Sequence, residues 1–175
     1  MKASTDYHSN VKISFQTAKT VNMGNLKEGD KAPVFKGKDQ HGKTVSLTDF
    51  KGKRVVLYFY PKDMTPGCTA QACNLRDNYD TLLKKGYAVV GVSTDSEQSH
   101  QKFIEKYELP FTLLADEDKK IVHQYGVYGE KQMMGKTYDG IHRTTFLIDE
   151  SGVIAHIIKK PDTKNHTEEI LELWK

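Results

Sequence analysis

The sequence predicts an α/β fold with a partly parallel central sheet flanked by helices. Two uninterrupted apolar runs, at 55–60 and 87–92, are typical of strands that are covered on both faces. Between them, apolar residues recur at three- and four-residue steps from Thr65 to Lys85, which predicts a helix. A strand, a helix and a second strand in this order form a parallel β–α–β crossover.

Further elements on both sides of this unit complete the expected fold. Val34–Phe35 and Val45–Leu47 flank the turn 39–42, which predicts an N-terminal β-hairpin. A helix from Ser96 to Tyr107 follows the second buried strand, with Ser96 as its N-cap. The remaining expected elements are a strand at 111–115, a short helix at 119–124, a Gly- and Lys-rich loop at 126–142 with a brief strand pair, strands at 144–148 and 153–158, and a helix at 163–174.

Composition indicates one globular domain. The chain has 175 residues, the size of a single domain. Its 26 basic and 23 acidic residues are interleaved and leave a formal charge of +3, whereas nucleic-acid binders gather their basic residues on one face. No apolar run approaches the roughly 20 residues of a membrane span. We therefore expect neither a nucleic acid nor a membrane as a partner.

Residues 1–22 differ in character from the rest of the chain. They are polar and lack the apolar stretch of a secretory signal. Their low content of acidic residues leaves an organelle transit peptide as the alternative, although such peptides are rich in arginine and this segment has none. We expect a disordered extension at 1–22, a domain at 23–175 and a cytoplasmic location.

The chemistry of the chain centres on Cys68, where a buried strand hands over to a helix. The carboxyl ends of strands are where ligands bind in open α/β sheets. If Thr65 is the N-cap, Pro66 takes the first helical position and Cys68 the third. Unpaired backbone N–H groups and the helix dipole at that end favour the thiolate, which is the nucleophilic form of cysteine. The alternative is a small buried thiol without a chemical role.

Cys73, the second of the two cysteines, lies five residues further along the same expected helix. That spacing turns the side chain by about 140° and separates the two Cα atoms by about 8.7 Å. A disulfide requires Cα atoms within about 7 Å, so the two sulfurs cannot join in an intact helix. Either Cys73 is a core residue unrelated to catalysis, or the helix unwinds locally.

A family resemblance extends from about Leu26 to the C-terminus. The stretch 58–76, YFYPKDMTPGCTAQACNLR, resembles the active site of the peroxiredoxin Q family, also called bacterioferritin comigratory proteins. The resemblance implies a thioredoxin-like fold with a central mixed sheet, flanking helices and an N-terminal β-hairpin. It continues outside that stretch at 29–33, 91–93, 109–111 and 143–149.

The resemblance also implies a role for five residues. Cys68 matches the peroxidatic cysteine, which becomes a sulfenic acid, and Cys73 matches the resolving cysteine of members with this C-x4-C spacing. Thr65 matches the threonine whose hydroxyl contacts thiolate and peroxide, Pro61 the proline that shields the site, and Arg143 the arginine beside the sulfur. The alternatives are an N-cap for Thr65, a strand terminator for Pro61 and a surface position for Arg143.

The implied activity is that of a thiol peroxidase in antioxidant defence. It reduces hydrogen peroxide and alkyl hydroperoxides, forms an intramolecular Cys68–Cys73 disulfide, and is recycled by thioredoxin or a similar dithiol. No cysteine follows Cys73, which argues against resolution by a partner subunit and favours a monomer. The rival hypotheses are a thioredoxin-type thiol–disulfide oxidoreductase, which the absence of a C-x-x-C pair disfavours, and a redox sensor without catalytic activity.

No cofactor or metal is expected. The seven histidines show no metal-ligand spacing, and the sequence has no phosphate loop, no Rossmann fingerprint and no evident anchor for flavin or haem. Met133 and Met134, in the loop before Arg143, could form an apolar wall near the substrate, but a place in the core is the favoured interpretation.

Overall fold

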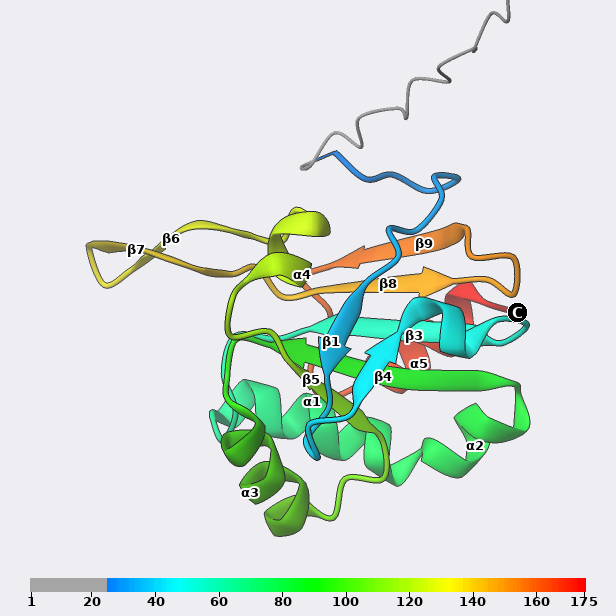
Figure 1. Cartoon of the computed structure of the whole chain (residues 1–175), viewed down its shortest axis with the longest axis horizontal. Helices are drawn as coiled ribbons and strands as arrows, with labels where there is room; N and C mark the ends of the chain where they lie inside the picture. The colour runs from blue at the N-terminus through cyan, green and yellow to red at the C-terminus, as the bar shows by residue number, and fades with distance from the viewer. Residues whose placement is uncertain (1–24) are drawn as a thin grey trace, which may run out of the picture.

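The computed structural model describes residues 25–175, which form a seven-stranded mixed sheet flanked by helices (Figure 1). The central strands are parallel, and antiparallel strands extend the sheet on both sides. The expected extension at 1–22 and the domain start at Met23 lie outside the described residues. The predicted fold class is confirmed. In spatial order the strands are β2 (Thr44–Ser46), β1 (Lys36–Lys38), β5 (Thr112–Ala115), β4 (Tyr87–Ser93), β3 (Arg54–Phe59), β8 (Thr144–Ile148) and β9 (Ile154–Lys159).

Helices and loops cover both faces of the sheet, which explains the continuous apolar run of β3. Val56 and Tyr58 pack on one face, against α1 (Pro66–Asp77), α2 (Tyr79–Lys84), α3 (Glu97–Tyr107) and α5 (His166–Leu173). Val55 and Leu57 pack on the other, against α4 (Lys120–Gln124) and the 3-10 helix η1 (Leu47–Phe50). Figure 1 shows α1, α2 and α3 below the strands β3, β4 and β5, and α4 above these three strands. Within residues 25–175, no helix is long and apolar enough to cross a bilayer.

The single helix expected from Thr65 to Lys85 is in fact two helices, α1 and α2, that meet at Asn78. Asn78 has φ −108° and ψ 12°, outside the helical range, and its side-chain amide donates to the carbonyl of Asn74 at 2.8 Å. Asparagine side chains compete in this way with backbone hydrogen bonds and so interrupt helices. Apolar periodicity persists across the break because both helices pack on the same core.

The expected loop at 126–142 is mostly a two-stranded hairpin, β6 (Tyr128–Met133) and β7 (Lys136–Ile141), paired along its whole length. Met134 and Gly135 form its turn with φ of 51° and 74°, the left-handed pair that two-residue hairpin turns require. The favoured core placement of Met133 and Met134 is wrong. Their side chains are 59% and 97% exposed at the hairpin tip.

The other expected elements are present with shifted ends. The N-terminal hairpin forms, and its turn is held by Asp39, whose Oδ1 accepts from the N–H groups of His41 at 2.8 Å and Lys43 at 2.9 Å. Ser96 caps α3, because its hydroxyl oxygen accepts the N–H of Ser99 at 3.1 Å. The last helix begins at His166 rather than Thr163.

The packing of the sheet yields a stability prediction at Gly91 on β4. A Cβ atom there would lie 2.7 Å from Leu113 Cδ2 and 2.8 Å from Tyr58 Cζ, both in the core beneath α1. We expect Gly91→Ala to lower the free energy of unfolding by about 1–3 kcal/mol, because overpacking displaces both side chains. Urea unfolding followed by circular dichroism measures this change.

Gly129→Ala is the matched control, since a Cβ atom at Gly129 would meet only His142 Nε2, at 3.8 Å. An alanine at Gly91 that proved as well tolerated as one at Gly129 would contradict this description of the core.

Candidate active site

The first turn of α1 lies just beyond the carboxyl end of β3. β3 ends at Phe59, Thr65 has the extended backbone of an N-cap residue, and Pro66 is the first helical residue. Cys68 follows at the third helical position and is 1% exposed. The predicted placement is confirmed. The sulfur is therefore held near the positive end of the helix dipole.

Arg143 contacts the sulfur directly: its Nη2 donates a hydrogen bond to Cys68 Sγ at 3.2 Å. Sheet register brings these residues together, because Phe59 at the end of β3 pairs with Thr144 at the start of antiparallel β8. Gly67 allows the close approach, since a Cβ atom there would lie 3.3 Å from Arg143 Nη2. A fixed guanidinium stabilises a thiolate and any negative charge that develops beside it.

Gln71, which no sequence pattern predicted as a site residue, completes this arrangement. Arg143 Nη1 donates to Gln71 Oε1 at 2.7 Å, so the guanidinium spans from Gln71 to Cys68. Gln71 is fully buried on the same helix face as Cys68, three residues later. The sequence does contain a sign of this role, because Gln71 is a polar residue on the helix face that also carries the buried residues Ala72 and Leu75.

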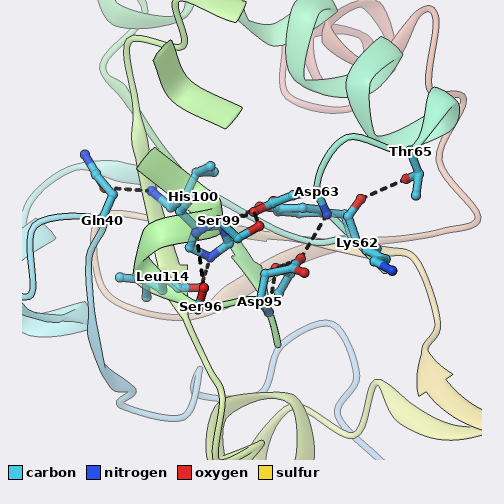
Figure 2. Close-up of polar contacts among 12 residues, drawn as sticks. Gln40, Lys62, Asp63, Thr65, Asp95, Ser96, Ser99, His100 and Leu114 are labelled. Carbon is cyan, nitrogen blue, oxygen red and sulfur yellow. Dashed lines mark hydrogen bonds and ion pairs between the residues drawn. The ribbon is translucent and has the colours of Figure 1, made fainter. Parts of the chain in front are cut away.

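The loop between β3 and α1 holds the two other predicted residues. Thr65 occupies the N-cap position, but its hydroxyl donates to the carbonyl of Lys62 at 2.8 Å instead of capping the helix (Figure 2). The hydroxyl oxygen keeps its acceptor sites, while its hydrogen is directed into the loop. Pro61 is half-buried directly after β3. The structure thus joins Cys68 and Arg143 by a hydrogen bond, and places Thr65 and Pro61 in the adjoining loop.

Tyr58 on β3 belongs to the same core cluster as Cys68 and stacks on Tyr60, with 5.4 Å between the ring centroids. Burial raises the pKa of Tyr58 well above its ordinary value, and the negative charge of Cys68 raises it further. The phenol therefore stays protonated at neutral pH and cannot act as a base. Its hydroxyl has no hydrogen-bond partner among the described protein groups.

A cavity of about 570 Å³ lies beside Arg143. Its described lining carries Lys131, Lys159 and Lys160 in addition to Arg143, and no carboxylate. Burial lowers the pKa of Lys131, and the charge of Arg143 lowers it further, while Lys131 Nζ donates to the carbonyl of Ile141 at 2.8 Å. Because four basic side chains and no carboxylate line the cavity, this side of the site is positively charged.

Cys73 lies on α1, as predicted, and both cysteines are free thiols. Cys73 is half-buried whereas Cys68 is buried. The helix is continuous between them, so ideal geometry keeps their Cα atoms about 8.7 Å apart, beyond disulfide reach.

The described residues provide no evident metal centre. Within residues 25–175 no three His, Cys, Asp or Glu side chains are grouped so that they could hold an ion. His100 and His166 are fully buried, and each contacts a carboxyl group, of Asp63 and Glu169 respectively.

Comparison with known proteins identifies relatives along nearly the whole described chain. Residues 28–157 match the model of the AhpC/TSA family. Peroxiredoxin Bcp of Escherichia coli K12 is 56% identical over 153 residues, which cover 87% of this chain and 98% of that protein. Peroxiredoxin Bcp of Bacillus subtilis is 47% identical over 147 residues, which cover 84% of this chain and 94% of that protein.

Solved structures show the same fold. A cysteine variant of Xanthomonas campestris peroxiredoxin Q superposes with a TM-score of 0.75 at 33% identity, covering 80% of this chain and 89% of that one. The bacterioferritin comigratory protein of the same organism, described for its alkyl peroxide reduction activity, gives 0.75 at 31% identity, covering 82% and 96%. A cysteine variant of Xylella fastidiosa PrxQ gives 0.80 at 29% identity, covering 85% and 95%.

The contact between Gln71 and Arg143 predicts that Gln71→Ala slows the reaction of Cys68 with hydrogen peroxide by about tenfold, because one hydrogen bond that orients the guanidinium is lost. Rapid quenching followed by mass spectrometry measures the oxidation rate. Gln124→Ala is the control, since the Gln124 side chain donates to the carbonyl of Val34, an exposed contact away from the site. Equal rates for the two variants would show that Gln71 does not orient Arg143.

Proposed function

The chain belongs to the AhpC/TSA family and is a peroxidase of the Bcp and peroxiredoxin Q type, which uses a peroxide and a thiol reductant. The resemblance noted in the sequence is thereby confirmed. We propose that Cys68 attacks the peroxide and that Arg143 assists it. The observation that carries the proposal is the 3.2 Å hydrogen bond from Arg143 to the sulfur of Cys68 at the start of α1.

In the first step, the Cys68 thiolate attacks the terminal oxygen of the hydroperoxide. A sulfur–oxygen bond forms, the O–O bond breaks, and the leaving oxygen takes a proton to become water or an alcohol. Arg143 stabilises the thiolate and then the charge that develops on the departing oxygen. Thr65 offers its hydroxyl at the helix start. To Pro61, half-buried directly after β3, we assign the shielding of the sulfur from bulk water.

In the second step, Cys73 attacks the Cys68 sulfenic acid, a disulfide forms and water leaves. The helix must unwind for this, because the two residues cannot meet while α1 is intact. Asn74 limits the unwinding. Its side-chain oxygen accepts the N–H of Thr167 and its amide donates to the carbonyl of Lys164, both at 2.8 Å, which ties α1 to the start of α5.

A dithiol protein such as thioredoxin then reduces the disulfide by exchange, and α1 folds again. We propose hydrogen peroxide and alkyl hydroperoxides as substrates, in line with the activity described for the X. campestris relative. Because resolution occurs within the chain, a monomer suffices. We place the enzyme in the cytoplasm, where thiol reductants keep such cycles running, as part of antioxidant defence.

Serine variants of the two cysteines separate the two steps. We expect Cys68→Ser to abolish peroxide consumption, since no thiolate remains at the site. Cys73→Ser should complete one turnover and stop at the sulfenic acid or a more oxidised form, because no thiol resolves it. Mass spectrometry of the peroxide-treated proteins shows the added oxygen and, in the unsubstituted protein, the 68–73 disulfide. Sustained thioredoxin-dependent turnover by Cys73→Ser would refute the resolving role.

The unwinding of α1 predicts a loss of helix on oxidation. Far-UV circular dichroism of the unsubstituted protein should lose about two turns of helix signal when the disulfide forms, and regain them with dithiothreitol. Cys73→Ser treated with equimolar peroxide should keep its helix, because oxidation there creates no cross-link. A 68–73 disulfide accompanied by an unchanged spectrum would contradict the proposed step.

A further inference from the structure

The loop that leads into α1 is held by a buried aspartate–histidine pair. Asp63 Oδ2 lies 2.7 Å from His100 Nδ1, and both side chains are at most 2% exposed. The same oxygen accepts from the hydroxyl of Ser99 at 2.8 Å, and Oδ1 accepts from the hydroxyl of Tyr60 at 2.6 Å. Figure 2 shows Asp63 meeting His100 and Ser99. Asp63 follows β3, whereas Ser99 and His100 belong to α3.

The second nitrogen of the histidine fixes the arrangement. His100 Nε2 lies 3.0 Å from the carbonyl of Leu114 on β5. A carbonyl can only accept, so Nε2 carries a proton and donates. With Nδ1 against the carboxyl group of Asp63, His100 bridges the loop to β5, and both ring nitrogens have a partner.

Backbone contacts extend the same network along the loop. The N–H of Asp63 donates to Asp95 Oδ2 at 2.9 Å, and Ser93 donates its hydroxyl to the same oxygen at 2.7 Å. The next residue, Met64, has a φ of 65°, which is unfavourable for a residue other than glycine. Thr65 follows and bonds back to Lys62. The contacts on both sides of Met64 therefore hold the chain in this conformation.

We infer that Asp63 and His100 are positioning residues for the peroxidase reaction, and this rests on the proposed role of Cys68. The buried pair fixes the loop 61–65 against α3 and β5, and the loop in turn fixes Thr65 and the first turn of α1, where Cys68 faces Arg143. Neither residue touches the sulfur. They act through the loop.

The proposed cycle explains why a fixed loop matters. The first turns of α1 open when the disulfide forms and must close again in the reactive geometry after reduction. A fully satisfied buried polar network specifies one arrangement, whereas apolar packing alone permits several. The network therefore gives α1 the same starting point in every cycle, and a small displacement of the sulfur from Arg143 slows the first step steeply.

Two substitutions of Asp63 test this inference. The reduced full-length chain is mixed with hydrogen peroxide, and the rate of Cys68 oxidation is measured by rapid quenching and mass spectrometry. Asp63→Ala removes every contact of the carboxylate, and we expect it to slow Cys68 oxidation by about ten- to a hundredfold. Asp63→Asn keeps the shape, and its amide can donate to Nδ1 of a neutral His100. We expect it to stay within about threefold of the unsubstituted rate.

Asp149→Ala is the matched control. The Asp149 carboxylate accepts the N–H groups of Ser151 at 2.9 Å and Val153 at 3.0 Å, but it follows β8 at the end opposite Arg143. We expect this variant to lose stability and keep its oxidation rate. If it slows as much as Asp63→Ala, the effect is general destabilisation and the inference is wrong. The inference also fails if Asp63→Ala reacts at the unsubstituted rate, or if Asp63→Asn is as slow as Asp63→Ala.

Removing one partner of a buried pair can unfold a protein. Should Asp63→Ala not fold, Ser99→Ala decides the question, because it deletes a single donor to Asp63. A rate lowered by about two- to fivefold supports the inference, and an unchanged rate overturns it. Failure of the proposed function itself would look different. The unsubstituted protein would then react slowly, or Cys68→Ser would retain activity.

Discussion

The antiparallel register between β3 and β8 is the constraint on which the site depends. It pairs Phe59 with Thr144, and so brings Arg143 next to the helix that starts after β3. A slip of one residue would turn each side chain of β8 to the opposite face of the sheet. Phe146 and Leu147 are buried on opposite faces, in different core clusters, so such a slip would disrupt the packing on both sides. The apolar core thus sets the strand register that brings Arg143 beside Cys68, and Gln71 then orients the guanidinium.

Buried polar groups in and against the first turns of α1 have fewer hydrogen-bond partners than those of the loop before the helix. Tyr58 OH, Thr69 Oγ1 and Gln71 Nε2 are buried and have no hydrogen-bond partner among the described protein groups. A buried unsatisfied group costs about 1–3 kcal/mol, and opening the first turns of α1 would expose these groups to water. The loop around Asp63, by contrast, has its buried carboxylate fully paired. Unsatisfied buried groups thus lie in and against the segment that the proposed cycle opens, whereas the buried carboxylate of the preceding loop is paired.

Sequence patterns predicted those parts of the molecule that local chemistry determines. The apolar runs identified β3 and β4, the serine before α3 identified its cap, and Thr-Pro-Gly-Cys placed Cys68 at a helix start. Patterns failed where a residue's partner is distant in sequence. Gln71 meets Arg143 across 72 positions and Asp63 meets His100 across 37, and neither pair has a local signature. The exposure of Met133 and Met134 has no sequence signature for a related reason, because it depends on their place at the tip of the hairpin.

The residues of α1 themselves indicate which part of the helix can open at low cost. Positions 66–73, PGCTAQAC, include no large apolar side chain, so unwinding them exposes little apolar surface. The first large core residue of the helix is Leu75, which lies after Asn74 has tied α1 to α5. Arg76 adds a second tie, because its Nη1 donates to the carbonyl of Tyr107 at 2.7 Å. The attachment of α1 to α5 thus begins at Asn74 and its large core side chains begin at Leu75, and Cys73 is the last residue before these two. Opening positions 66–73 for the proposed 68–73 disulfide therefore leaves Leu75 and the two attachments of α1 in place.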